Sequence, residues 1–125
     1  MPDKRKILVV EDDHDARTLL CMMLNSLGYE TEDYDSGEAA LANADKLTVN
    51  LAMLDIMMPE MDGFELLQKL KELSQFKEVP VIMVTAKDKD DDVMQGYNHG
   101  ADYYITKPYT VEQIKYAVEL YLTDE

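Results

Sequence analysis

The chain has little cysteine and no long apolar run, and each shortage excludes a class of protein. Cys21 is the only cysteine in 125 residues, which excludes a disulfide framework and a cysteine-rich zinc site and suits a reducing compartment. No apolar stretch approaches the roughly 20 residues that span a bilayer. Residues 1–6 are polar and basic, without the apolar core of a secretion signal. We therefore expect a cytoplasmic protein without a membrane partner.

Positive charge is also scarce. Lys and Arg total 12 against 26 Asp and Glu, which gives a formal net charge of −14. Such a balance repels nucleic acid and anionic membranes, so the domain alone should not bind nucleic acid directly. The length and the 46% hydrophobic content fit one globular domain with one core.

Short apolar runs alternate with amphipathic segments along the whole chain. The runs predict strands at residues 7–10, 29–34, 49–54, 80–84 and 103–106, with the polar second strand near an edge. Helices are predicted at 16–27, 36–44, from about 64, from 88–92 to 100, and from 110, where Thr110 and Gln113 match a capping box. In the third helix Phe64, Leu67 and Leu70 should face inward and Glu65, Lys69 and Lys71 should face water. About five β/α units with short connections predict an α/β fold, a single doubly wound domain with a parallel sheet covered by helices on both faces.

Polar side chains stand at the ends of four predicted strands. They are Glu11, Asp12 and Asp13 after the first, Asp55 after the third, Thr85 after the fourth and Lys107 after the fifth. In an open α/β sheet a ligand site lies outside the carboxyl ends of the strands, so we expect these side chains to converge. Asp13 could instead serve only to begin the following helix favourably.

Converging carboxylates need a compensating charge. Two carboxylates about 5 Å apart repel by roughly 3 kcal/mol at an effective dielectric near 20. A divalent cation such as Mg²⁺ can compensate, since it takes oxygen ligands from one or two carboxylates together with phosphate. An aspartate such as Asp55 can act as a nucleophile on a phosphoryl group, while Thr85 and Lys107 could neutralise that group's oxygens.

Four motifs follow one another in a specific order and spacing. They are Ile7-Leu-Val-Val-Glu-Asp-Asp13, Leu54-Asp-Ile-Met-Met-Pro59 with Asp62-Gly63, Val84-Thr-Ala86, and Gly100-Ala-Asp-Tyr-Tyr-Ile-Thr-Lys-Pro108. Together they resemble the receiver domain of bacterial two-component response regulators, and the chemotaxis receivers among them. The resemblance covers essentially the whole chain and implies a (βα)5 domain with a five-stranded parallel sheet in the flavodoxin-like order 2-1-3-4-5.

The resemblance also assigns roles to individual residues. It implies that Asp55 is the phosphoacceptor and that Mg²⁺, for which Mn²⁺ could substitute, is bound by Glu11, Asp12, Asp55 and the Met57 backbone carbonyl. It implies phosphoryl contacts from Thr85, the Ala86 backbone and Lys107, a switch formed by Thr85 and Tyr104, and a cis bond before Pro108. Met57 and Lys87 flank the path of the attacking water in this family. Because Met57 is apolar and Lys87 can pair with phosphate, we expect slow self-dephosphorylation.

The resemblance further implies the partners. A sensor histidine kinase or a histidine phosphotransfer protein donates the phosphoryl group, and a downstream protein binds the face formed by the last two helices and the strand between them. The domain is then no enzyme beyond its own phosphotransfer and self-dephosphorylation. Winged-helix members dimerise through charges at the positions of Val93 and Gln113, both uncharged here, so we expect a monomer or weak dimer. We expect residues 1–125 to be a single receiver domain, with no output domain in this chain.

Three other functions compete with this one. A phosphatase with an aspartate nucleophile usually needs a second Asp where this chain has Met57. A flavin-binding protein of the same topology needs a phosphate loop after the first strand, where residues 11–13 would repel phosphate. A degenerate receiver used only for binding commonly lacks the acceptor, an acid or the lysine, and all of them are present here.

Overall fold

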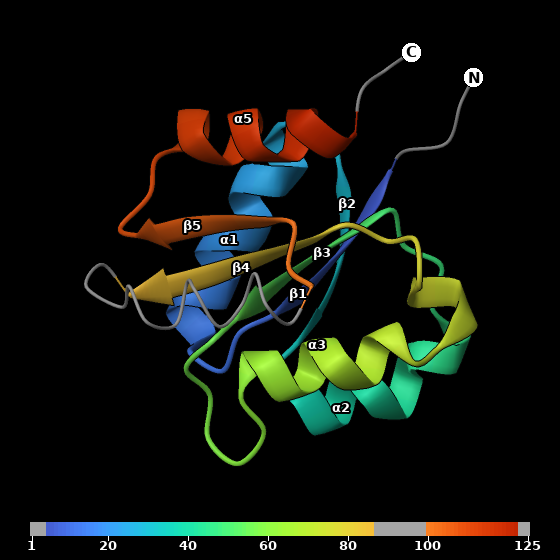
Figure 1. The fold of residues 1–125 in the computed structure, drawn as a ribbon. Helices are drawn as coiled ribbons and strands as arrows, with labels where there is room; N and C mark the ends of the chain where they lie inside the picture. The colour runs from blue at the N-terminus through green and yellow to red at the C-terminus, as the bar shows by residue number, and fades with distance from the viewer. Residues whose placement is uncertain (1–4, 87–99, 123–125) are drawn as a thin grey trace.

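The computed structural model describes residues 5–86 and 100–122 and shows one β-sheet with helices packed on both faces (Figure 1). Its elements are β1 (Lys6–Val10), α1 (His14–Ser26), β2 (Glu30–Tyr34), α2 (Gly37–Asn43), β3 (Leu51–Asp55), α3 (Gly63–Lys71), β4 (Val81–Ala86), β5 (Tyr103–Lys107) and α5 (Val111–Tyr121). Short 3-10 turns follow α2 at Ala44–Lys46 and α3 at Ser74–Phe76. The helix predicted between 88–92 and 100 lies outside the described residues, as do Lys87 and Val93.

All strand pairs are parallel, and the sheet order β2-β1-β3-β4-β5 confirms the expected topology. The polar strand β2 lies at an edge, as predicted. Helices α1 and α5 cover one face of the sheet and α2 and α3 cover the other (Figure 1). Successive strand residues point to opposite faces, and the central strands are apolar on both because both faces are covered. None of the helices in the described part of the chain is long and apolar enough to span a bilayer.

Each described α-helix begins at a side chain that caps it. Asp13, Ser36, Asp62 and Thr110 accept hydrogen bonds from the backbone N–H three residues further on. The bond from Ala16 N to Asp13 Oδ2 is 2.8 Å long. The Thr110 capping box predicted from the sequence is confirmed, with both reciprocal bonds present. These caps satisfy N–H groups that have no partner inside the helix.

Several sequence predictions differ from the structure. Strand β4 runs to Ala86 rather than to residue 84, so Thr85 lies inside the strand and not after it. Helix α1 begins at His14, two residues before the predicted start at residue 16. The prediction missed this first turn because its residues are polar and show no apolar periodicity. Strand β3 begins at Leu51 rather than at residue 49; the Asn50 side chain accepts a hydrogen bond from the Lys6 N–H just before the ladder starts. Lys71 does not simply face water, since its Nζ donates to the Val79 carbonyl at 2.6 Å and holds the loop after α3.

The loop from β3 to α3 contains one strained residue. Glu60 has a φ of 68°, a left-handed conformation that costs a side-chain-bearing residue about 1–2 kcal/mol. Replacing Glu60 by glycine should therefore raise the free energy of unfolding by about 0.5–1 kcal/mol, the gain being reduced by the greater chain entropy of glycine. Urea denaturation of Glu60→Gly checks this. Glu60→Ala is the matched control, because it removes the same charge but keeps the Cβ, and an equal gain there would contradict the explanation.

Candidate active site

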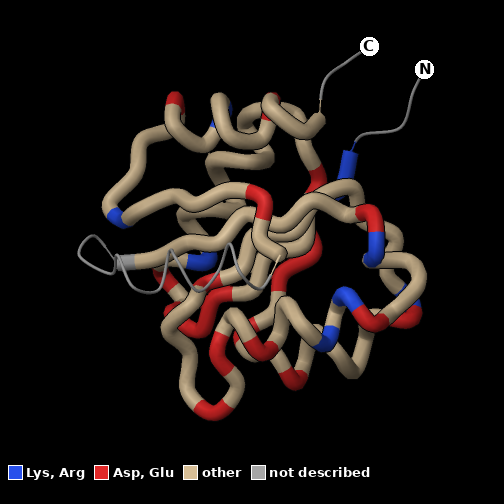
Figure 2. Tube along the Cα trace, viewed as in Figure 1, with Lys and Arg blue, Asp and Glu red and all other residues tan. Residues whose placement is uncertain are grey.

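The carboxyl ends of β1 and β3 bring three acids together. Carboxylate oxygens of Glu11, Asp12 and Asp55 lie within 4.8 Å of one another. Glu11 and Asp55 are 5% and 4% exposed, while Asp12 is exposed to solvent. Figure 2 shows acidic segments gathered at this end of the sheet, toward which the β3 and β4 arrows point in Figure 1. The convergence predicted from the strand ends is therefore present for Glu11, Asp12 and Asp55, whereas the Asp13 carboxylate caps α1.

Lys107 reaches into this cluster from the end of β5. Its Nζ lies 2.9 Å from Glu11 Oε1 and 3.7 Å from Asp55 Oδ1. The nearer partner is Glu11, whose other oxygen accepts a hydrogen bond from the Asp13 N–H at 3.1 Å. Glu11 is thus compensated on both oxygens, whereas Asp55 Oδ1 has the more distant lysine and a 3.4 Å bond from the Met57 N–H.

Because their contacts are unequal, the two buried acids differ in their pKa values. Burial raises the pKa of Glu11, but the hydrogen bonds from Lys107 and from the Asp13 N–H outweigh it and hold that pKa below its ordinary value. Burial, followed by the neighbouring Glu11 charge, raises the pKa of Asp55 to about 7. Burial also lowers the pKa of Lys107, but its bond to Glu11 outweighs that effect and the pKa is raised. Near neutral pH, Glu11 and Lys107 form an ionised pair and Asp55 carries a proton part of the time.

The loop after β3 packs closely beneath Asp55. Gly63, the first residue of α3, donates its N–H to the Ile56 carbonyl at 3.0 Å. A Cβ at Gly63 would collide with the Asp55 carbonyl oxygen and would lie 2.9 Å from the Ile56 Cα. Only glycine allows α3 to approach β3 this closely, so the Asp62-Gly63 motif fixes the backbone that carries Asp55.

A sequence model of the response regulator receiver domain matches residues 7–119. The chain belongs to the response regulator receiver family. This receiver is 38% identical over 122 residues to the transcriptional regulatory protein RprY of Bacteroides fragilis, covering 98% of the receiver and 51% of that protein. It is 37% identical over 113 residues to the phosphate regulon transcriptional regulatory protein PhoB of Escherichia coli, covering 88% and 48%. The chain spans about half the length of these curated relatives.

Solved structures give the same assignment. Chemotaxis protein CheY4 of Vibrio cholerae superposes with a TM-score of 0.91 at 30% identity, over 96% of this receiver and 100% of that chain. Membership of this family implies a part in two-component signalling, and receiver domains are not an enzyme family by themselves. Relatives such as PhoB are transcriptional regulators, and the expectation that this domain does not bind nucleic acid stays a prediction.

The other predicted site residues that the structure describes stand on or next to the strands that carry the cluster. Thr85 is fully buried in β4, one residue beyond Val84, the register partner of Asp55, and Ala86 ends that strand. The peptide bond before Pro108 is cis, as the resemblance implies. Met57 is 55% exposed beside Asp55. Lys87 lies outside the described residues.

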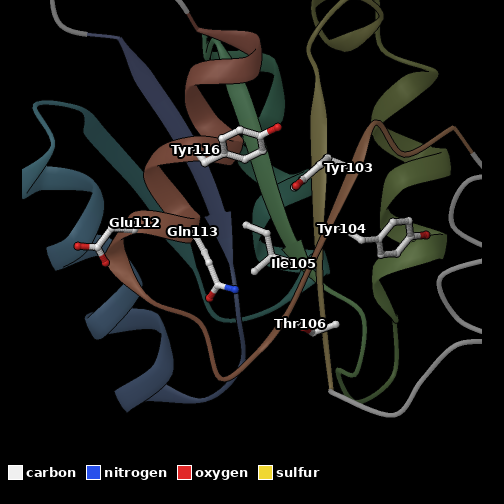
Figure 3. Close-up of a pocket in the computed structure, with 7 residues that line it drawn as sticks. All are labelled: Tyr103, Tyr104, Ile105, Thr106, Glu112, Gln113 and Tyr116. Carbon is white, nitrogen blue, oxygen red and sulfur yellow. The ribbon is translucent and has the colours of Figure 1, made fainter.

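Tyr103 and Tyr104 leave β5 on opposite sides (Figure 3). Tyr103 points toward α5, where its ring centroid lies 6.5 Å from that of Tyr116. Tyr104 points the other way and packs half-buried against the core beneath α3. A pocket of about 300 Å³ lies between this strand and α5, lined among others by Tyr104, Thr106 and Gln113. Tyr104, the predicted switch residue, therefore borders this pocket while its ring points away from α5, and it stands on the strand that carries Lys107.

Two contributions to the site do not follow from the sequence pattern. Arg17, four residues into α1, donates from Nη1 to the Glu11 carbonyl at 2.9 Å. The Asp62-Gly63 dipeptide predicts a turn, but not the close approach of Gly63 to Asp55. A lone arginine in an otherwise acidic stretch is the available clue for Arg17, but nothing in the spacing predicts its partner.

Proposed function

We propose that this receiver accepts a phosphoryl group on Asp55 from a phosphohistidine of a sensor histidine kinase or histidine phosphotransfer protein, at a site that also binds Mg²⁺. The observation that carries the proposal is the cluster of Glu11, Asp12 and Asp55, in which Glu11 and Asp55 are buried and both face the Lys107 ammonium. Membership of the receiver family supports it.

The donor set fits a hard divalent cation. Three carboxylates and one ammonium, if all are ionised, give a local charge of −3 + 1 = −2, and two of the acids are almost fully buried. All the available ligands are oxygens, which suit Mg²⁺ or Mn²⁺, and we infer that the Met57 carbonyl completes the protein's share. When bound, the cation would supply the positive charge that keeps Asp55 ionised and balances the phosphoryl oxygens.

The chain's own residues have distinct tasks in the transfer. An Asp55 carboxylate oxygen forms the new P–O bond while the P–N bond to the donor histidine breaks, and the leaving imidazole takes up a proton from solvent. The raised pKa of Asp55 means that its proton must leave first. We infer that Lys107, Thr85 and the Ala86 N–H balance the oxygens of the transferred group. Lys107 can do so by a small shift from Glu11, because it already lies 3.7 Å from Asp55.

Intact-mass measurement after incubation with Mg²⁺ and acetyl phosphate tests the proposal. Wild type should gain the mass of one phosphoryl group, and Asp55→Asn should gain none, because an amide is no nucleophile toward phosphorus. Removing Mg²⁺ with a chelator should also abolish this gain in mass. An adduct of equal yield in Asp55→Asn would sink the proposal, while wild type without any adduct would favour a receiver that serves only as a binding module.

We further infer that the phosphorylated state is long-lived. Met57 is exposed beside Asp55, and its apolar side chain cannot orient a water molecule for attack. A Met57→Asn variant could hold that water by a hydrogen bond worth about 0.5–1.5 kcal/mol, which would shorten the phospho-Asp55 half-life by about twofold to tenfold. Mass spectrometry after removal of phosphodonor measures the decay. Met57→Leu is the control and should decay like wild type; an unchanged half-life in Met57→Asn would contradict the role. We propose that Lys87 also prolongs the phosphorylated state, by pairing with the phosphoryl oxygens.

We propose that signalling uses the surface of β5 and α5 in the cytoplasm. Phosphorylation would favour a state in which Thr85 moves toward the phosphoryl group and Tyr104 turns inward, a population shift that changes the pocket beside Tyr104. A downstream protein would read that change, with the receiver acting as a monomer or weak dimer. Retained phosphorylation together with lost partner binding in Tyr104→Ala would support this route.

A further inference from the structure

Arg17 binds the backbone between the two acids that follow β1. Its Nη1 donates to the Glu11 carbonyl at 2.9 Å, and that carbonyl belongs to the peptide group joining Glu11 to Asp12. The Arg17 Nε also donates to Asp33 Oδ2 at 3.1 Å, at the end of β2. The Arg17 side chain is only 15% exposed and its bond to the Glu11 carbonyl is partly buried, whereas its partner Asp33 is 46% exposed.

The opposite side of the same backbone is held as well. The Glu11 N–H donates to the Tyr34 carbonyl at 3.1 Å, where β2 ends. The Asp13 N–H donates to the Glu11 carboxylate, and the Asp13 carbonyl accepts from the Arg17 N–H at 2.9 Å. Rotation of the Glu11–Asp12 peptide would break the bond to the guanidinium. The two carboxylates project from the two ends of this peptide, so its orientation sets their directions relative to each other.

We propose that Arg17 is a positioning residue for metal binding: its guanidinium fixes the Glu11–Asp12 peptide so that both carboxylates face one cation. This inference rests on the proposed function, because it presumes that the acidic cluster binds Mg²⁺. Residues that orient metal ligands without touching the metal typically contribute 10–100-fold to affinity.

The planar arrangement of N–H donors on the guanidinium, rather than its charge alone, performs this role. Arg17 is paired with Asp33, so the pair adds little net charge to the cluster. An arginine can bind the Glu11 carbonyl and Asp33 together through different nitrogens in one plane, whereas a lysine ammonium is a single point on a flexible stem. Arg17→Lys keeps the positive charge but removes the planar set of donors. It therefore distinguishes an effect of the guanidinium geometry from an effect of its charge.

Mg²⁺ titration followed by backbone-amide NMR shifts at Asp12, Asp13 and Met57 measures the effect without phosphorylation. Arg17→Met should raise the Mg²⁺ dissociation constant by about tenfold, and Arg17→Lys by at least about threefold. Lys6→Met is the matched control, since it removes a cation paired with the β2 residue Glu32 at 3.4 Å, in an ion pair that makes no contact with Glu11. Because exposed ion pairs contribute little, its dissociation constant should stay within roughly twofold of wild type.

Each result has one meaning. If wild type and Lys6→Met bind Mg²⁺ and both Arg17 variants bind it equally well, the role of Arg17 is refuted while the proposed function stands. If wild type shows no Mg²⁺-dependent shift, the metal site of the proposed function fails and this inference falls with it. Urea denaturation in chelator separates stability from affinity, and Arg17→Lys decides the question if Arg17→Met does not fold.

Discussion

Replacing Gly63 by alanine should destabilise the domain strongly, although the change adds only one methyl group. The new Cβ would collide with the Asp55 carbonyl oxygen and lie 2.9 Å from both the Ile56 Cα and the Met83 Cε. Two of these three neighbours are backbone atoms, which cannot rotate aside, so α3 must move away from β3. We expect a loss of about 2–4 kcal/mol in the free energy of unfolding, measured by urea denaturation. Displacement of Asp55 should also slow phosphorylation by acetyl phosphate.

Gly37→Ala is a matched control for this prediction. Gly37 is likewise a buried glycine at the first position of a helix, α2, and the three atoms nearest to its added Cβ would all belong to the Met61 side chain, with the sulfur at 2.7 Å. A methionine side chain is flexible and can move aside, so the cost should stay below about 1 kcal/mol. Similar losses in both variants would show that the helix start, rather than the Asp55 backbone, is responsible.

Lys107→Met should have opposite effects on phosphorylation and on metal binding. The variant leaves the buried Glu11 carboxylate without its 2.9 Å partner. Because Lys107 is one-third exposed, we expect a loss of about 1–3 kcal/mol in chelator, below the range for a fully buried pair. Mg²⁺ should bind more tightly, since a competing cation has left the cluster. Phosphoryl uptake at saturating Mg²⁺ should fall by about 10²-fold, the typical cost of removing one charge-stabilising group.

Chemical denaturation with and without Mg²⁺, together with intact-mass kinetics, measures all three quantities. Lys115→Met provides the control, because it makes the same substitution on the exposed outer face of α5. Its stability should change by less than about 0.5 kcal/mol and its phosphorylation should not change. Weaker Mg²⁺ binding in Lys107→Met would show that the lysine supports the acid cluster rather than competing with the cation.

The positions of the strands could be predicted because hydrophobic patterning is a local property of the chain. Residues 7–10 are apolar without alternation, which predicts a strand covered on both faces, and all four are buried. The helix starts at Ser36 and Thr110 were equally predictable, because a cap acts on N–H groups within three residues. The errors at His14 and Asn50 arose at element ends, where a polar residue has no periodicity to reveal it.

The sequence also predicted which residues meet at the site, since parallel strands carry their carboxyl ends to one edge. Glu11 follows β1, Asp55 ends β3 and Lys107 ends β5, and the three lie together there. Their unequal charge states could not be predicted in this way. Asp55 and Glu11 are both buried acids at strand ends, yet their pKa values move in opposite directions.

The sequence by itself determined the fold class, the family and the set of acids, because pattern, spacing and order along the chain carry that information. Only the tertiary structure decided that Lys107 lies nearer to Glu11 than to Asp55, that Arg17 binds the Glu11 carbonyl, and that Gly63 lies against the Asp55 backbone. Each of these depends on through-space distance and on burial. Electrostatic energies vary with both, and neither follows from separation along the chain.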